Sequence, residues 1–163
     1  MNTLIIIESY FGNTLQIAHA IADTLPNAQI QSFDEAPDVI PDDINLLLLG
    51  APTHEAALPT PKSRQLAATR SANRIQPPPQ RGLAEWAKHA NIPAGTRTIT
   101  FDTSAGKFAT LFGCAAKAAA KQLRARGFQV ERGPSFTVTA GDVLVAGQQE
   151  QAAQWAASLL SEN

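Results

Sequence analysis

The sequence lacks the residue patterns of several common protein classes. Its single cysteine, Cys114, excludes an internal disulfide and any metal site built from cysteine alone. The three histidines are scattered and form no H-E-x-x-H pattern, so we expect no metal site. No apolar run reaches membrane-spanning length, and no secretory signal opens the chain. We therefore expect a cytoplasmic protein with no membrane partner.

Net charge is also low, at −1 over 163 residues. A nearly neutral chain offers no bulk attraction to phosphate backbones, so we expect no nucleic-acid partner. The length predicts a single domain covering residues 1–163. The bases nevertheless gather in residues 56–84, which hold no acid. Either they attract an acidic protein or the phosphates of a nicotinamide cofactor, or they lie on a solvated loop. These bases are Lys62, Arg64, Arg70, Arg74 and Arg81.

Motifs of other catalytic and signalling classes are missing as well. The sequence contains no G-x-G-x-x-G, no G-K-[ST] and no G-x-S-x-G, which argues against a Rossmann dinucleotide site, a Walker loop and a serine hydrolase. A receiver domain needs clustered acids after its first strand and an aspartate after its third. Here the first strand is followed only by Glu8, and the third by Gly50-Ala51-Pro52, so we reject that class.

A strand, a polar turn and a helix open the chain and organise the rest. Four consecutive aliphatic residues predict a buried strand over about residues 3–8. Ile17, Ile21 and Leu25 repeat at helical spacing and predict a helix over 13–25. Hydroxyl, amide and glycine residues fill the turn between them. The N–H groups of a helix N-terminus bind anions, so this turn suits a phosphate. In the alternative interpretation, Ser9 or Asn13 only caps the helix.

Strands and helices are predicted to alternate along the remaining chain. Proline-rich residues 51–80 are predicted to form a long loop, with a helical turn at about 64–72. Continuous aliphatic strands separated by helices predict a three-layer α/β/α sandwich, with a five-stranded parallel sheet of order 2-1-3-4-5. The further strands are expected at 28–33, 44–49 and 97–102, with a last strand in two parts at 128–130 and 135–138; the further helices are expected at 83–90, 113–126 and 148–160.

The turn after the first strand resembles the phosphate loop of flavodoxins. That loop usually has the pattern [TS]-x-[TS]-G-N-T, and Ser9, Gly12, Asn13 and Thr14 match it. Phe11 stands where a threonine or serine is common, so one hydroxyl donor is lost. The resemblance spans the whole chain, because polar loops also follow the third and fourth predicted strands. In a 2-1-3-4-5 sheet these three strands are neighbours, so we expect their loops to converge.

The flavodoxin resemblance implies a bound FMN. The first loop would hold its 5′-phosphate, and the other two would clasp its isoalloxazine ring. The cofactor-binding residues implied are Ser9, Tyr10, Phe11, Gly12, Asn13, Thr14, Pro52, Thr53, His54, Asp102, Thr103, Ser104, Gly106 and Phe108. Many flavodoxins stack a Trp or Tyr on the ring from the second and third loops. Here the second loop offers His54 and the third offers Phe108.

Function follows from the same resemblance. It implies an FMN-binding redox protein, either a flavodoxin-like electron carrier or an NAD(P)H- or quinone-linked reductase. Its partner would be a redox protein or a small-molecule electron acceptor. Diffusible flavodoxins are strongly acidic, and the near-neutral charge of this chain favours the reductase. The alternative is a binding or regulatory module that keeps the flavodoxin-like fold without the flavin.

Several residues admit a functional and a structural interpretation. His54 either donates a proton to a quinone-like substrate or is an exposed loop histidine. Asp102 and Thr103 either bind the flavin edge or form a turn and cap a helix. Glu8 is expected to be a solvated residue at the end of a strand. Cys114 is expected to pack as a small apolar residue.

Overall fold

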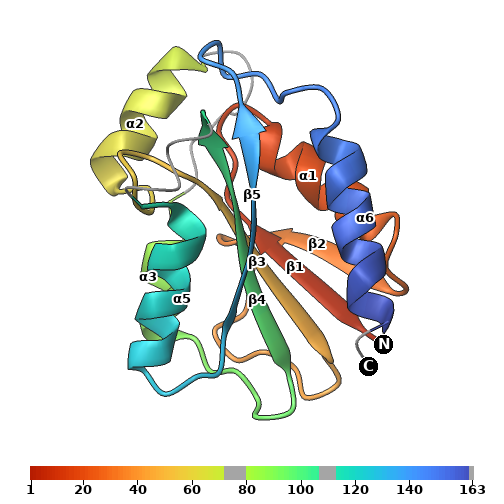
Figure 1. Cartoon of the computed structure of the whole chain (residues 1–163). Coiled ribbons are helices and arrows are strands. Elements are labelled where there is room, and N and C mark those ends of the chain that lie inside the picture. The colour runs from red at the N-terminus through yellow and green to blue at the C-terminus, as the bar shows by residue number, and fades with distance from the viewer. Residues whose placement is uncertain (72–79, 107–112, 162–163) are drawn as a thin grey trace.

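The computed structural model describes residues 1–71, 80–106 and 113–161. Five strands of this part of the chain form a parallel sheet of order β2-β1-β3-β4-β5, which confirms the predicted order (Figure 1). The strands are β1 (Thr3–Ile7), β2 (Ala28–Ser32), β3 (Leu46–Pro52), β4 (Arg97–Ala105) and β5 (Glu131–Val138).

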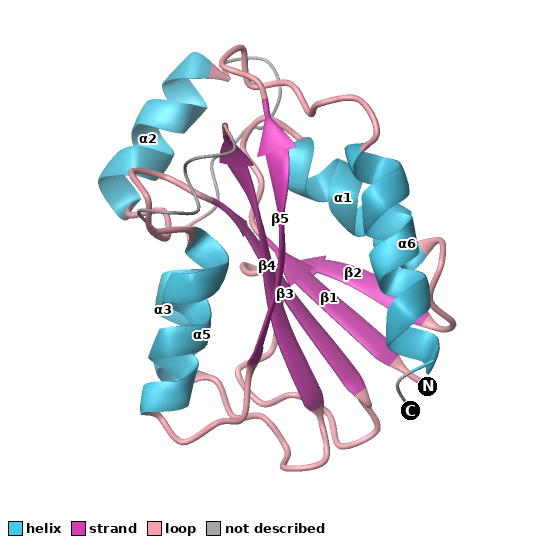
Figure 2. Ribbon diagram, viewed as in Figure 1, coloured by secondary structure: helices cyan, strands magenta, loops and turns pink. Residues whose placement is uncertain are grey.

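Helices cover both faces of the sheet and complete the predicted three-layer sandwich (Figure 2). Side chains alternate between the faces of a strand. Ile5 and Ile7 of β1 therefore pack with α1 (Asn13–Ala22) and α6 (Gln148–Ser161). Leu4 and Ile6 pack with α3 (Leu83–His89) and α5 (Ala115–Ala125) on the other face. Burial on both faces explains why the central strands are aliphatic throughout.

A further helix, α2 (Pro61–Arg70), lies beyond the carboxyl ends of the strands in Figure 1. The predicted helical turn at 64–72 is therefore part of a longer helix, and the prediction of a loop was wrong over residues 61–63. The Thr60 hydroxyl accepts from the backbone N–H of Ser63, and Pro61 occupies the first helical position. Residues 53–60 contain no helix and no strand of the sheet, and residues 72–79 of the predicted loop lie outside the described residues.

The last strand also departs from the prediction. β5 is one continuous strand over Glu131–Val138 rather than two parts. Gly133 and Pro134 suggest a break in the sequence, because proline cannot donate to a sheet ladder. β5 is the edge strand beside β4, and edge strands tolerate proline. Pairing accommodates the interruption through a register shift between Thr100 and Asp102.

The described helices do not have membrane-spanning character. Within residues 1–71, 80–106 and 113–161, none combines the length and the apolar composition that a bilayer crossing needs.

Candidate functional site

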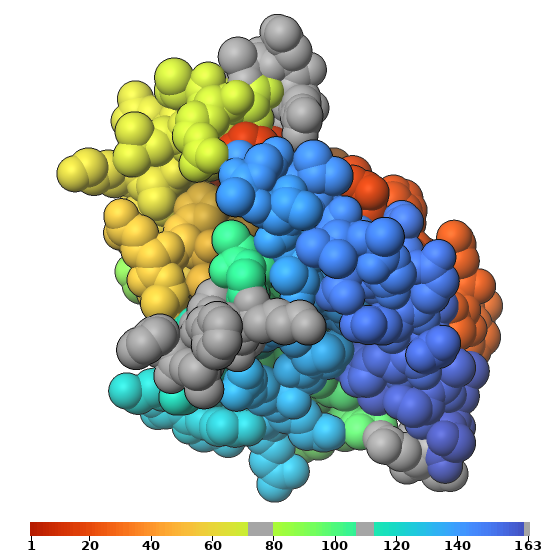
Figure 3. Space-filling model, turned by 45° about the horizontal axis from the view of Figure 1, so that its top comes forward, coloured from red at the N-terminus to blue at the C-terminus, as the bar shows by residue number. Residues whose placement is uncertain are grey.

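The loops after β1 and β3 and the last residues of β4 meet at a cavity of about 310 Å³. Thr103 and Ser104, predicted to lie in the third loop, belong to β4, which runs to Ala105 instead of ending at residue 102. α2 adds Ser63, Leu66, Ala67 and Arg70 to its wall, and the segment after β5 adds Asp142. Figure 3 shows the N-terminal loop in red between α2 in yellow-green and the segment after β5 in blue. The cavity therefore has two walls that the sequence did not predict.

Most of the predicted cofactor-binding residues line this cavity. They are Ser9, Tyr10, Phe11, Asn13, Thr14, Pro52, Thr53, His54, Thr103 and Ser104. Gly12 belongs to the same first loop but is not among the lining residues, and neither are Asp102 and Gly106. Phe108 lies outside the described residues.

Helix α1 begins directly at the cavity. Gly12 precedes it with a φ of 87°, a left-handed conformation that glycine adopts without strain. The first turn of a helix has N–H groups without partners inside the helix, and its dipole attracts anions. The N–H of Leu15, in this first turn, donates to Ser9 Oγ at 3.4 Å. Ser9 therefore caps the helix, as the alternative interpretation of the turn proposed. A Cβ on Gly12 would meet no atom within 4 Å, so the space beside it is open.

The hydrophilic side chains at the start of α1 bind other parts of the chain. Thr14 Oγ1 lies 2.9 Å from Thr103 Oγ1 and joins the start of α1 to the end of β4. Asn13 Nδ2 donates to the carbonyl of Asp142 at 2.9 Å, in the segment after β5. Backbone N–H groups, rather than these side chains, are therefore the donors left for an anion.

The carboxylate of Glu8, which was expected to be exposed to solvent, is buried beneath the first loop. Glu8 is only 2% exposed, so the expectation of a solvated residue was wrong. Tyr10 donates its hydroxyl to Glu8 Oε2 at 2.5 Å, and the Leu83 N–H donates to Oε1 at 3.2 Å. One signal pointed to this outcome: Glu8 directly continues a strand whose five residues are all buried. A charge in that position needs partners, because its desolvation is costly.

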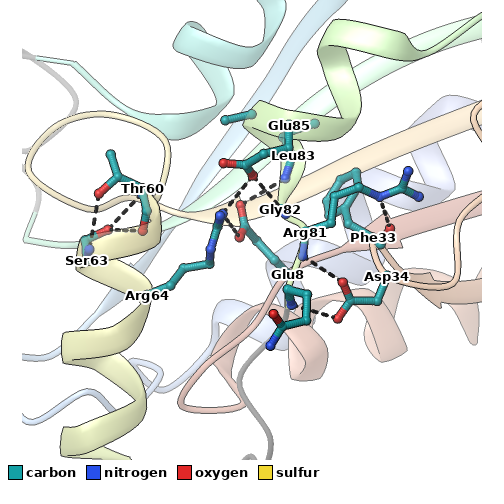
Figure 4. Close-up of polar contacts among 12 residues, drawn as sticks. Glu8, Phe33, Asp34, Thr60, Ser63, Arg64, Arg81, Gly82, Leu83 and Glu85 are labelled. Carbon is teal, nitrogen blue, oxygen red and sulfur yellow. Dashed lines mark hydrogen bonds and ion pairs between the residues drawn. The ribbon is translucent and has the colours of Figure 1, made fainter.

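Arg64 of α2 supplies the positive charge of this cluster. Its Nη1 lies 3.7 Å from Glu8 Oε2 and 2.9 Å from Glu85 Oε2, as Figure 4 shows. Burial raises the pKa of Glu8 to about 7, although hydrogen bonds from Tyr10 and Leu83 and the charge of Arg64 lower it. Burial, with the nearby Glu8, also raises the pKa of Tyr10 well above its usual value, so the phenol keeps its proton.

Three of the five bases in residues 56–84 make ion pairs within the protein. Besides Arg64, Arg70 pairs with Asp142 at 2.7 Å, and Arg81 pairs with Asp38 at 2.7 Å. The interpretation of a solvated basic loop was wrong for Arg64, which is 4% exposed, whereas the side chain of Arg70 is 64% exposed. Arg74 lies outside the described residues.

His54 occupies the second loop and faces both α2 and the first loop. Its Nδ1 lies 2.9 Å from Ser63 Oγ, and its ring centroid lies 5.4 Å from that of Tyr10. Burial lowers the pKa of His54, and the positive charge of Arg64 lowers it further. The imidazole is therefore neutral at pH 7 and is held on two sides, unlike an exposed loop histidine.

Asp102 turns away from the cavity toward α5. It is fully buried, and its Oδ2 accepts the backbone N–H of Ala116 at 2.9 Å. Thr53 Oγ1 accepts the neighbouring N–H, from Ala115, at 2.9 Å. Both side chains satisfy the N-terminus of α5, as the capping alternative for Asp102 proposed. Cys114 is buried beside them, as expected, and burial raises the pKa of its thiol.

Metal binding finds no support in the described part of the chain. Within it, no group of three His, Cys, Asp or Glu side chains is arranged to hold a metal ion.

Comparison with solved structures shows a flavodoxin-like fold. A flavodoxin from the domain Archaea superposes with a TM-score of 0.60 and 14% identity, over 99% of this chain and 98% of that one. Flavodoxin 1 from Bacillus cereus gives a TM-score of 0.58 and 16% identity, over 100% and 99%. An azoreductase from Bacillus anthracis gives 0.52 and 9%, over 97% and 100%. No protein-family model and no curated protein matches the sequence.

Proposed function

We propose that this protein binds FMN at the cavity and acts in redox chemistry. The observation that carries the proposal is the meeting of the loops after β1 and β3 with the end of β4 at the N-terminus of α1. Carboxyl ends of neighbouring parallel strands are the usual ligand site in open α/β sheets. The named flavodoxins among the similar structures support the same cofactor.

The residues around the cavity suit FMN in two respects. Open space beside Gly12 and the backbone N–H groups at the start of α1 suit a phosphate. Phe11, Pro52 and Leu66 provide apolar and aromatic walls for a flat ring. When bound, FMN supplies the electron-transfer chemistry, and the protein supplies binding and orientation.

The chain's own residues have distinct roles in this proposal. The start of α1 would hold the phosphate, and the walls from the first and second loops would hold the ring. The neutral imidazole of His54 offers one hydrogen-bonding nitrogen, because Ser63 engages the other. α2 forms one wall of the cavity, which favours a reductase with a small electron acceptor over a carrier that docks on proteins.

A second candidate is the flavin-free binding module. The observation in its favour is that Asn13 and Thr14 use their side chains to hold Asp142 and Thr103. Phe11 further removes a hydroxyl that the flavodoxin pattern usually has. Such a module would keep the fold and bind another anion, or none.

Reconstitution distinguishes the two candidates. The purified chain is mixed with excess FMN, desalted, and measured by visible absorption. The proposal predicts a retained flavin spectrum at a ratio approaching one per chain. A colourless protein after desalting would reject FMN binding and leave the flavin-free module.

A further inference from the structure

We infer that Arg70 makes this site selective for a phosphorylated ligand, exchanging its present partner Asp142 for the phosphate. The inference rests on the proposed function and extends it, since the flavodoxin resemblance implied only the first loop as phosphate-binding. In this inference, Arg70 strengthens the binding of a phosphorylated ligand and the carboxylate of Asp142 weakens it.

The guanidinium of Arg70 lies over the first loop. Its Cζ is 5.5 Å from the centroid of the Phe11 ring, and Phe11 immediately precedes Gly12 and α1. Arg70 lines the cavity while 64% of its side chain stays exposed, so the group can move without disturbing the core. It therefore brings a positive charge to the edge of the cavity at which α1 begins.

Asp142 links this charge directly to α1. Its carboxylate Oδ2 accepts from Arg70 Nη2 at 2.7 Å, while its backbone carbonyl accepts from Asn13 Nδ2 at 2.9 Å. Asn13 is the first residue of α1. The carboxylate that neutralises Arg70 consequently belongs to a residue anchored at the helix N-terminus, beside the proposed phosphate position.

The Asp142 carboxylate is a replaceable partner. Ion pairs between exposed side chains contribute little net free energy, because water already solvates both charges. A phosphate carries more charge and accepts two parallel hydrogen bonds from a guanidinium. It also repels the Asp142 carboxylate. Removing Arg70 should therefore weaken a phosphorylated ligand, and neutralising Asp142 should strengthen it.

Titrations with FMN and riboflavin, which lacks the phosphate, test this exchange. Four proteins are compared: the unchanged chain, R70Q, D142N and the control K62Q. Lys62 is exposed on the same helix and does not line the cavity. Asp142 has a φ of 59°, which asparagine tolerates equally well, and D142N keeps the carbonyl that binds Asn13.

The expected pattern is specific. R70Q weakens FMN binding about tenfold and leaves riboflavin binding unchanged, since a lost charge-assisted hydrogen bond acts on the phosphate alone. D142N tightens FMN binding about threefold, and K62Q changes the affinity for neither ligand.

If the Arg70–Asp142 pair only stabilised the cavity, R70Q and D142N would instead weaken the binding of both FMN and riboflavin. That result, or an unchanged FMN-to-riboflavin ratio in R70Q, overturns the inference while FMN binding stands. If the unchanged chain binds neither flavin, the proposed function falls and the inference with it.

Discussion

The hydroxyl of Tyr10 donates to Oε2 of the buried Glu8 across 2.5 Å, two residues back along the chain. Tyr10 also lines the cavity, so this bond fixes an aromatic wall of the site to the end of β1. Glu8 in turn contacts Arg64 of α2 and Leu83 of α3. One carboxylate thus joins the first loop to α3, which packs on the sheet, and to α2, which lies beyond the carboxyl ends of the strands.

Glu8→Gln should change how stability depends on pH. The pKa of Glu8 is raised to about 7 in the folded chain from 4.5, so the folded state holds a proton that the unfolded state releases between these values. The contribution of Glu8 to the free energy of unfolding is largest below pH 4.5. It is lost as the pH rises toward 7, by up to about 1.4 kcal/mol per pH unit. Relative to the unchanged chain, the variant should gain stability across this window and remain level above it. Urea unfolding at several pH values measures this difference, and a difference independent of pH would contradict the assignment.

Arg64→Met should be strongly destabilising. The variant leaves Glu8 buried without a counter-charge, and removing one partner of a buried pair costs about 3 kcal/mol. The loss should shrink at acid pH, because Glu8 is then protonated. Denaturant unfolding gives both values. Lys62→Met, on the exposed side of the same helix, is the matched control and should stay within about 0.5 kcal/mol of the unchanged chain. Equal losses in the two variants would refute the role of the ion pair.

Gly82→Ala should disturb the same cluster sterically. A Cβ there would overlap Glu8 Oε2 and Arg64 Nη1, although the backbone φ of −115° is available to alanine. Displacing this packed pair should cost about 2 kcal/mol in the free energy of unfolding. Gly95→Ala is the control, because a Cβ at Gly95 meets nothing within 4 Å. Thermal or urea unfolding of both variants makes the comparison, and a Gly82 variant as stable as the Gly95 variant would be inconsistent with the geometry.

His54 should titrate below its usual pKa of 6.5. Burial is the larger cause and the charge of Arg64 the second, so Arg64→Met should move the midpoint back toward 6.5. NMR of the imidazole C–H resonances follows the titration, and the missing signals of a His54→Gln variant assign the resonance. A midpoint above 6.5 in the unchanged chain would show that the imidazole is not buried as described.

The sheet could be predicted from sequence because its signal is local. Central strands buried on both faces must be aliphatic throughout, as residues 4–7 and 46–49 are. The carboxyl ends of β1, β3 and β4 then lie side by side. Their meeting at the cavity therefore followed from strand order alone.

α2 and the Glu8 cluster could not be predicted in the same way. The buried residues of α2 are Arg64 and Ala67, so the helix has no aliphatic stripe to reveal it. Burial of Glu8 depends on Leu83, which lies 75 residues further along the chain. The arrangement of Arg70 against Asp142 spans 72 residues and depends on an unusual backbone conformation at Asp142. Such long-range polar pairs have no periodic signature in the sequence.

The proposed phosphate position at the start of α1 is tested most directly by fluorescence titration of FMN with the unchanged chain, Gly12→Asp and Gly12→Asn. Both variants place a side chain in the open space beside a left-handed backbone, and asparagine and aspartate tolerate that conformation similarly. Only aspartate adds a negative charge beside the helix N-terminus. We predict that the unchanged chain and Gly12→Asn bind FMN, and that Gly12→Asp binds at least about tenfold more weakly than Gly12→Asn. Equal affinities of the two variants, or no binding by the unchanged chain, would contradict the account.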